Sequence, residues 1–224
     1  MMSETVLIVA PHPDDEILGC GGTILRHIDE GDTVHWCLFT EMRPRKGITE
    51  DQIAERDKLI ASVAACVPFN SCLRLGFESA ALEETPKRSM VETFTTALNS
   101  IRPSIVYAPF KYDAHSDHCR VSNVVSAACK PFRAPYVKKL LAYETLSETN
   151  QVVESSAMRF TPNYYVDITK FSEKKRSLLM LYKTELGEHP FPRSIEAVSA
   201  LEILRGSEAN VLRAESFMIL RAIH

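Results

Sequence analysis

The chain has 224 residues, of which 45% are hydrophobic and 25% are charged, and its formal net charge is −3. This is the composition of an ordinary globular protein, and the length suffices for one large domain with a sizeable core. The slightly acidic balance argues against non-specific binding to nucleic acids, which needs a marked basic excess. The longest uncharged run, residues 59–73, is too short to span a bilayer.

Cysteine usage and the amino terminus favour a reducing compartment. The six cysteines form no C-x-x-C pair, and most of them stand in apolar surroundings, which is typical of core thiols. Residues 1–4 lack the basic region of a signal peptide. We therefore expect a cytoplasmic protein without a membrane span.

Strand and helix patterns alternate along the chain. Apolar runs predict strands at residues 6–10, 33–40, 72–75, 104–108 and 139–143, with an edge strand at 164–166. Helical patterns cover 19–30, the segment from the Thr49–Gln52 capping box to Val67, the segment from Pro86 to Ile101, and residues 121–129, 170–186 and 194–205. Such alternation implies a parallel sheet covered on both faces. We predict one domain over residues 1–224, an α/β fold that is Rossmann-like, with a mostly parallel sheet, helices on both faces and a helical C-terminal extension.

A polar loop at residues 41–47 follows the second predicted strand and carries Arg43, Arg45 and Lys46. Such a loop is by default a solvated surface segment. The alternative is a lid whose cations grip an anionic group of the substrate.

Two clusters of metal-ligand residue types follow predicted strands. PHPDDE (residues 11–16) comes directly after the first strand, and DAHSDH (residues 113–118) comes shortly after the strand at 104–108. Ligand sites of α/β sheets lie beyond the carboxyl ends of the strands, so the two clusters converge if their strands are neighbours. Either cluster alone is more typical of a helix cap or a solvated loop. Two clusters in this position favour a site.

His12, Asp15 and His118 form the natural ligand set, because catalytic zinc usually has three histidine or carboxylate ligands and a water. Asp14 would then stand beside the metal and could take a proton from water. These parts are typical of a metal-assisted hydrolase.

The second cluster supplies two further groups. His115 lies one helical turn before the predicted ligand of its cluster, where it could stabilise an oxyanion or protonate a leaving amine. Asp117 could orient a histidine from behind.

The glycines at positions 19, 21 and 22 suggest a dinucleotide-binding turn only superficially. The G-x-G-x-x-G pattern needs a glycine at position 24, where Ile24 stands, and the glycines come well after the strand rather than at its turn. We predict instead that they let the first helix pack closely on the sheet.

PHPDDE followed by LGCGGT, together with D-x-H-x-D-H later in the chain, resembles the PIG-L/LmbE family of zinc-dependent N-deacetylases. The tail, from PRS at 192–194 to AESF at 214–217, resembles the branch that includes bacillithiol-pathway and related sugar deacetylases. The resemblance implies zinc bound by His12, Asp15 and His118. It also implies that Asp14 is the general base and that His115 is the acid or oxyanion stabiliser, while Asp117 supports the histidine.

The resemblance also implies substrate contacts. Family members use an arginine of the second helix, for which Arg56 is the nearest candidate, although Leu59 stands where the family has a glutamate. Glu144 either faces the pocket or forms a structural salt bridge. Family members are often oligomers, and we expect a homo-oligomer interface at the C-terminal helices.

We therefore expect a zinc-dependent hydrolase that removes an N-acetyl group from an N-acetylglucosamine-type sugar or sugar conjugate. Another divalent metal could replace zinc. Two alternatives stay open: a metal-dependent hydrolase of another amide or ester, and a non-catalytic sugar- or nucleotide-binding protein on the same scaffold.

Overall fold

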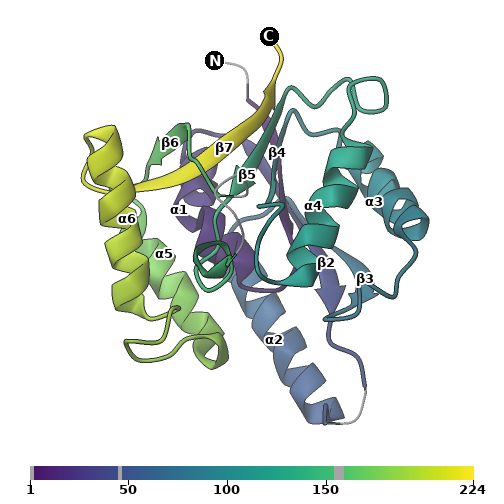
Figure 1. The fold of residues 1–224 in the computed structure, drawn as a ribbon, viewed down its shortest axis with the longest axis horizontal. Coiled ribbons are helices and arrows are strands. Elements are labelled where there is room, and N and C mark those ends of the chain that lie inside the picture. Colours follow the sequence, from purple (N-terminus) through teal and green to yellow (C-terminus); the bar gives the residue numbers. More distant parts are fainter. Residues whose placement is uncertain (1–2, 45–46, 154–158) are drawn as a thin grey trace.

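The computed structural model describes residues 3–44, 47–153 and 159–224. Its centre is a seven-stranded sheet in the order β3-β2-β1-β4-β5-β7-β6 (Figure 1). Strands β1 to β5 pair in parallel, and β7 runs antiparallel to both of its neighbours. The predicted Rossmann-like α/β class with a mostly parallel sheet is confirmed. The strands are β1 (Thr5–Ala10), β2 (Thr33–Glu41), β3 (Ser71–Glu78), β4 (Ile105–Pro109), β5 (Lys139–Tyr143), β6 (Tyr164–Asp167) and β7 (Ala214–Ala222).

Helices cover both faces of the sheet. Alternate side chains of β1 enter different cores: Leu7 and Val9 pack with α3 and α4, whereas Val6 and Ile8 pack with α1, α2 and α5. None of the helices within the described ranges is long and apolar enough to cross a membrane. The helices are α1 (Asp15–Asp29), α2 (Glu50–Cys66), α3 (Lys87–Ile101), α4 (Ser116–Ala128), α5 (Ser172–Leu179) and α6 (Ile195–Ala209), with 3₁₀ turns η1 (Thr149–Gln151) and η3 (Met180–Glu185).

The carboxyl ends of β1 and β4 form the point at which the strand order reverses. From β1 the chain proceeds to β2 and β3 on one side, and it returns to β4 and β5 on the other. The two strands are neighbours in register, with Ile8 opposite Tyr107. The first cluster follows β1 directly and the second follows β4 shortly after its end, so both lie at one edge of the sheet. The condition on which the predicted convergence depended, that the two strands are neighbours, is met.

Both clusters also lie closer to helix starts than predicted. Helix α1 begins at Asp15 rather than at residue 19, and α4 begins at Ser116 rather than at 121. The helix predicted at 170–186 is α5 followed by η3, because Tyr182 has non-helical backbone angles. Acidic side chains at helix N-termini are stabilised by the helix dipole, which accounts for the early starts.

The end of the chain differs from the prediction of a purely helical extension. Residues after α6 form β7, which inserts between β5 and β6 (Figure 1, yellow). Glu215 of β7 accepts hydrogen bonds from the backbone N–H groups of Gly22 (2.8 Å) and Thr23 (2.7 Å) inside α1. Its carboxylate also lies 2.8 Å from Lys175 Nζ of α5. The last strand is thus tied to the first helix by a buried charge.

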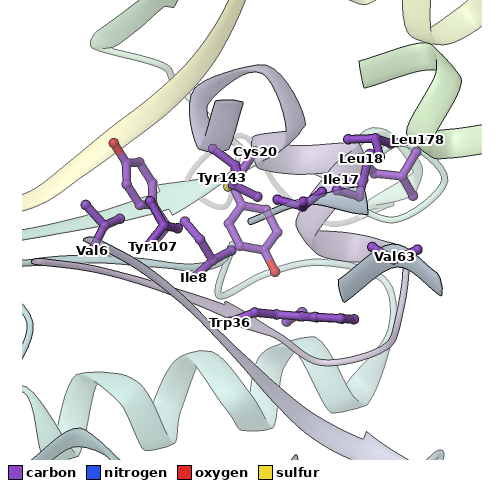
Figure 2. Packing of buried hydrophobic residues seen from close by; sticks show 14 of the residues in the cluster. Val6, Ile8, Ile17, Leu18, Cys20, Trp36, Val63, Tyr107, Tyr143 and Leu178 are labelled. Carbon is purple, nitrogen blue, oxygen red and sulfur yellow. The ribbon is translucent and has the colours of Figure 1, made fainter. Parts of the chain in front are cut away.

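The glycines of α1 serve close packing, as predicted. A Cβ atom placed on Gly19 would lie 2.3 Å from Tyr143 Cδ2, and one on Gly22 would lie 2.6 Å from Ile168 Cβ. Figure 2 shows Tyr143 in the core beside Ile17 and Cys20 of the same helix, and the Tyr143 hydroxyl donates to the Val9 carbonyl oxygen at 2.9 Å. Gly19 therefore lets α1 approach β5 at Tyr143, and Gly22 lets it approach Ile168, which follows β6.

Replacing Gly19 with alanine should lower the free energy of unfolding. Overpacking costs roughly 1–3 kcal/mol, which outweighs the gain of about 1 kcal/mol that alanine has over glycine in a helix. Urea denaturation of the two proteins measures the difference. A variant that is as stable as the wild type, or more stable, would contradict the close approach of α1 to Tyr143.

Candidate metal and catalytic site

The loop between β1 and α1 is held in an uncommon backbone conformation. Asp14 precedes the first residue of α1 and has φ 130°, in a region that residues other than glycine rarely adopt. Its N–H donates to Glu16 Oε2 at 3.1 Å, and Glu16 Oε1 in turn accepts from the Tyr182 hydroxyl at 2.5 Å. Glu16 is therefore a buried support of this turn. Strained residues that the surroundings fix in this way cluster at functional sites.

Three side chains converge where the two loops meet. Asp15 Oδ2 lies 3.3 Å from His12 Nδ1 and 3.2 Å from His118 Nε2. One ligand atom from each of the three residues lies within 4.8 Å of the others. All three side chains are buried or nearly so, with 15%, 4% and 1% of the side chains of His12, Asp15 and His118 exposed.

A second carboxylate stands behind each histidine. Asp117 Oδ2 lies 3.0 Å from His12 Nε2, and Asp113 Oδ2 lies 2.8 Å from His118 Nδ1. Asp113 Oδ1 also accepts from the Thr149 hydroxyl at 2.6 Å. Carboxylates in this position fix the orientation and tautomer of histidines that bind metals. Asp117 thus contacts His12. The contact of Asp113 with His118 was not predicted, although Asp113 belongs to the same sequence motif.

The donor set fits a divalent transition metal ion. Two imidazole nitrogens and one carboxylate oxygen are typical ligands of zinc, and each imidazole is oriented by its own carboxylate. The described residues hold two further groups of metal-ligand types: His12 with His115 and Asp117, which overlaps this set, and His27 with Glu30 and Asp32, which fits less well. Both ring nitrogens of His27 are engaged, by Asp32 at 2.7 Å and by the Tyr107 hydroxyl at 3.0 Å.

The charges of the cluster depend strongly on one another. Burial lowers the pKa of His12, but its hydrogen bonds to Asp117 and Asp15 outweigh burial and raise that pKa to about 9. Burial would raise the pKa of Asp15, yet the two histidines hold it well below its usual value. Asp14 differs, because burial and the neighbouring Asp15 charge raise its pKa to about 7. Adjacent carboxyl groups therefore have opposite tendencies to bind a proton.

Arg193 reaches the site from the segment that precedes α6. Its Nη1 donates to Asp14 Oδ2 at 2.7 Å, and its Nε donates to the Ser147 hydroxyl at 2.8 Å. Glu148 and Glu185 lie 3.5 and 3.7 Å from the same guanidinium. Arg193 was not among the site residues predicted from the sequence. The only signal was its place in the Pro-Arg-Ser segment of the tail.

These groups open into a cavity of about 200 Å³. His115 lines it, with its ring centroid 4.5 Å from that of His12, and its Nδ1 accepts from the Asp117 N–H at 3.1 Å. Arg56 also lines it, with Nη1 bound to Glu185 Oε1 at 2.6 Å. The predicted site residues that the structure brings into this cavity are His12, Asp14, Asp15, Arg56, His115 and His118.

The structure does not bring Glu144 into this cavity. Its two carboxylate oxygens accept from Arg205 at 2.7 Å each, and Ser216 donates to it at 2.6 Å. This matches the salt-bridge alternative of the sequence analysis. In the basic loop, Arg43 bonds to the Gly76 carbonyl oxygen and approaches Glu41, while positions 45 and 46 lie outside the described residues.

Comparison with known proteins found a matching family and a related protein, both described as deacetylases. The family described as PIG-L: GlcNAc-PI de-N-acetylase matches residues 7–129, more than half of the chain. The diacetylchitobiose deacetylase of Thermococcus kodakarensis is 25% identical over 195 residues, which are 82% of this chain and 70% of that protein.

Two solved structures share the whole fold. The conserved protein TT1542 from Thermus thermophilus has a TM-score of 0.77 and 27% identity, over 100% of this chain and 97% of that one. GalB from Pseudomonas putida, a 4-carboxy-2-hydroxymuconate hydratase, has a TM-score of 0.74 at 14% identity, over 99% of this chain and 98% of that one. The second likeness shows the fold alone, so the activity has to be argued from the site.

Proposed function

Because the chain belongs to the PIG-L family, we propose that it is a zinc-dependent hydrolase that removes the N-acetyl group from an N-acetylglucosamine-type sugar or sugar conjugate. One observation carries the proposal: His12, Asp15 and His118 converge in a cavity that also holds Asp14 and His115. The family description and the name of the Thermococcus relative, both of which denote deacetylases, support the choice of reaction.

The proposed ligands are His12, Asp15 and His118. Zinc held there would polarise the amide carbonyl and lower the pKa of a water molecule. Asp117 and Asp113 keep the two imidazoles in the orientation that presents Nδ1 of His12 and Nε2 of His118 to the cavity.

Asp14 is the proposed general base. Arg193 holds its Oδ2, which fixes the direction of the carboxyl group while the whole side chain stays buried at the cavity wall. Asp14 takes a proton from the water that attacks the carbonyl carbon. The C–N bond then breaks, and the acyl group leaves as acetate while the sugar nitrogen, which gains a proton, leaves as an amine.

His115 completes the proposed chemistry. Because its Nδ1 accepts the Asp117 N–H, the neutral ring carries its proton on Nε2. That N–H can donate a hydrogen bond to the carbonyl oxygen as it becomes negative. Passing a proton to the leaving nitrogen would instead need the doubly protonated, cationic ring, which returns to the neutral form when the proton leaves. Arg56 lines the same cavity and is the proposed substrate contact.

We also propose that the protein is cytoplasmic. Its assembly into a homo-oligomer stays a prediction. All six cysteines are free thiols in the structure, which supports a reducing compartment: Cys20, Cys37, Cys66, Cys72, Cys119 and Cys129.

The direct test is release of acetate. The zinc-loaded protein should liberate acetate and a free amine from N-acetylglucosamine conjugates, and a chelator should abolish the release. Binding of such sugars without acetate release would favour a non-catalytic protein. Hydrolysis confined to other amides or esters would favour the metal-dependent hydrolase of another amide or ester.

Asp14→Asn should lower kcat by roughly 10²- to 10⁴-fold, the usual contribution of a general base. Zinc content, measured by mass spectrometry of the purified protein, should stay at the wild-type level. Asp32→Asn is the matched control, since it makes the same substitution at an aspartate that lies before β2, outside the cavity lining. Turnover of the Asp14 variant at the wild-type rate would rule out its role as base.

His118→Ala should lose most of the bound zinc, because it removes one of the three proposed ligands. His27→Ala, which changes the histidine of the less suitable cluster, should keep the wild-type zinc content. The same metal analysis serves for both variants. Full zinc occupancy in His118→Ala would refute the ligand set.

Asp113→Asn should weaken zinc affinity by about 10- to 100-fold, the range seen when the carboxylate behind a histidine ligand is altered. Competition with a fluorescent chelator measures this affinity. Unchanged affinity would show that Asp113 does not support His118.

A further inference from the structure

We propose that a groove between α2 and η3 binds the group to which the N-acetylated sugar is attached, and that this group presents apolar surface. The inference rests on the proposed deacetylase function. The groove has a volume of about 480 Å³, against about 200 Å³ for the cavity that holds the cluster. Small-molecule sites typically measure ~300–1,000 Å³, so the cavity alone is small for a sugar conjugate.

The groove adjoins the cavity. Met42, Arg56 and Glu185 line both of them. The Arg56–Glu185 ion pair, 2.6 Å long, joins α2 to η3 at the place where the two spaces meet. Arg56 Nη2 also donates to the Pro13 carbonyl oxygen at 3.0 Å, within the loop between His12 and Asp14. A ligand that occupies the groove therefore lies next to the reacting end of the site.

The lining decides which chemistry fits the groove. Leu59 and Leu181 pack against the core on the face of the sheet that α1, α2 and α5 cover, and they also line the groove, beside Met42. Five charged residues line the groove: Glu55, Lys58 and Lys183 are exposed side chains that face water, and Arg56 and Glu185 pair with each other. The apolar floor therefore supplies the main contact, as in most small-molecule sites.

The cavity itself offers little to an anionic group. Each arginine that lines it contacts an acid: Arg56 lies 2.6 Å from Glu185, Arg74 lies 2.8 Å from Asp57, and Arg193 lies 2.7 Å from Asp14. Neutral hydroxyl and amide groups suit such a lining better than a phosphate or carboxylate would. The sugar ring fits this cavity, and its apolar substituent extends into the groove.

The methyl and phenyl glycosides of N-acetylglucosamine, of one anomeric configuration, distinguish the two spaces. We expect kcat/KM for acetate release to be at least tenfold higher with the phenyl glycoside. Ser62→Trp, which fills the groove from α2, should lower the phenyl-to-methyl ratio of kcat/KM at least fivefold. Ala61→Trp introduces the same side chain at the exposed neighbouring position outside the groove lining, and it should leave the ratio unchanged.

The possible failures are separable. Acetate released from both glycosides with equal kcat/KM, or a ratio that Ser62→Trp does not alter, would overturn the groove assignment and leave the deacetylase function standing. Acetate released from neither glycoside by the zinc-loaded protein would overturn both proposals.

Discussion

The parallel pairing of β1 with β4 is the constraint on which the rest of the structure depends. It places two loops side by side although His12 and Asp117 are 105 positions apart in the sequence. Each loop runs directly into the N-terminus of a helix, so Asp15 and Asp117 stand where the helix dipole stabilises a negative charge. The strand pair supplies position, and the two helices supply electrostatic support.

Burial makes this arrangement demanding, because an unpaired charge in an apolar interior is costly. In the structure, acids and histidines alternate, so that each carboxylate lies beside an imidazole. The pairs are Asp113 with His118, His118 with Asp15, Asp15 with His12, and His12 with Asp117. Asp14 stands outside this chain and is held by Arg193 instead. Asp14 and Asp15, neighbours in one motif, thus bind different partners. A hydratase has the same fold, so the sheet alone does not define an activity.

The sequence predicted the parts of the molecule that local patterns encode. Strand and helix alternation indicated the parallel sheet, and the residue types after two strands indicated where the cluster would form. Arg193 could not be found in this way, because its partner Asp14 is 179 positions away and nothing local marks the pair. Strand β7 was not predicted, because its sequence lacks the regular alternation of apolar and polar residues. It also follows a helix yet pairs antiparallel with β5. The starts of α1 and α4 were predicted too late in the sequence, because the polar residues of the two motifs are also typical of loops.

The position of β7 has a consequence for the synthesis of the chain. In the described sheet, β6 at the edge is joined to the other strands only through β7, which follows the six other strands of that sheet in the chain. A chain that ends before Ala214 would leave the edge of β5 unpaired and would leave Gly22 and Thr23 of α1 without the Glu215 carboxylate. An unpaired edge strand is a template for aggregation. Prematurely terminated chains therefore lack both the strand that pairs with β5 and the carboxylate that binds the helix beginning at Asp15.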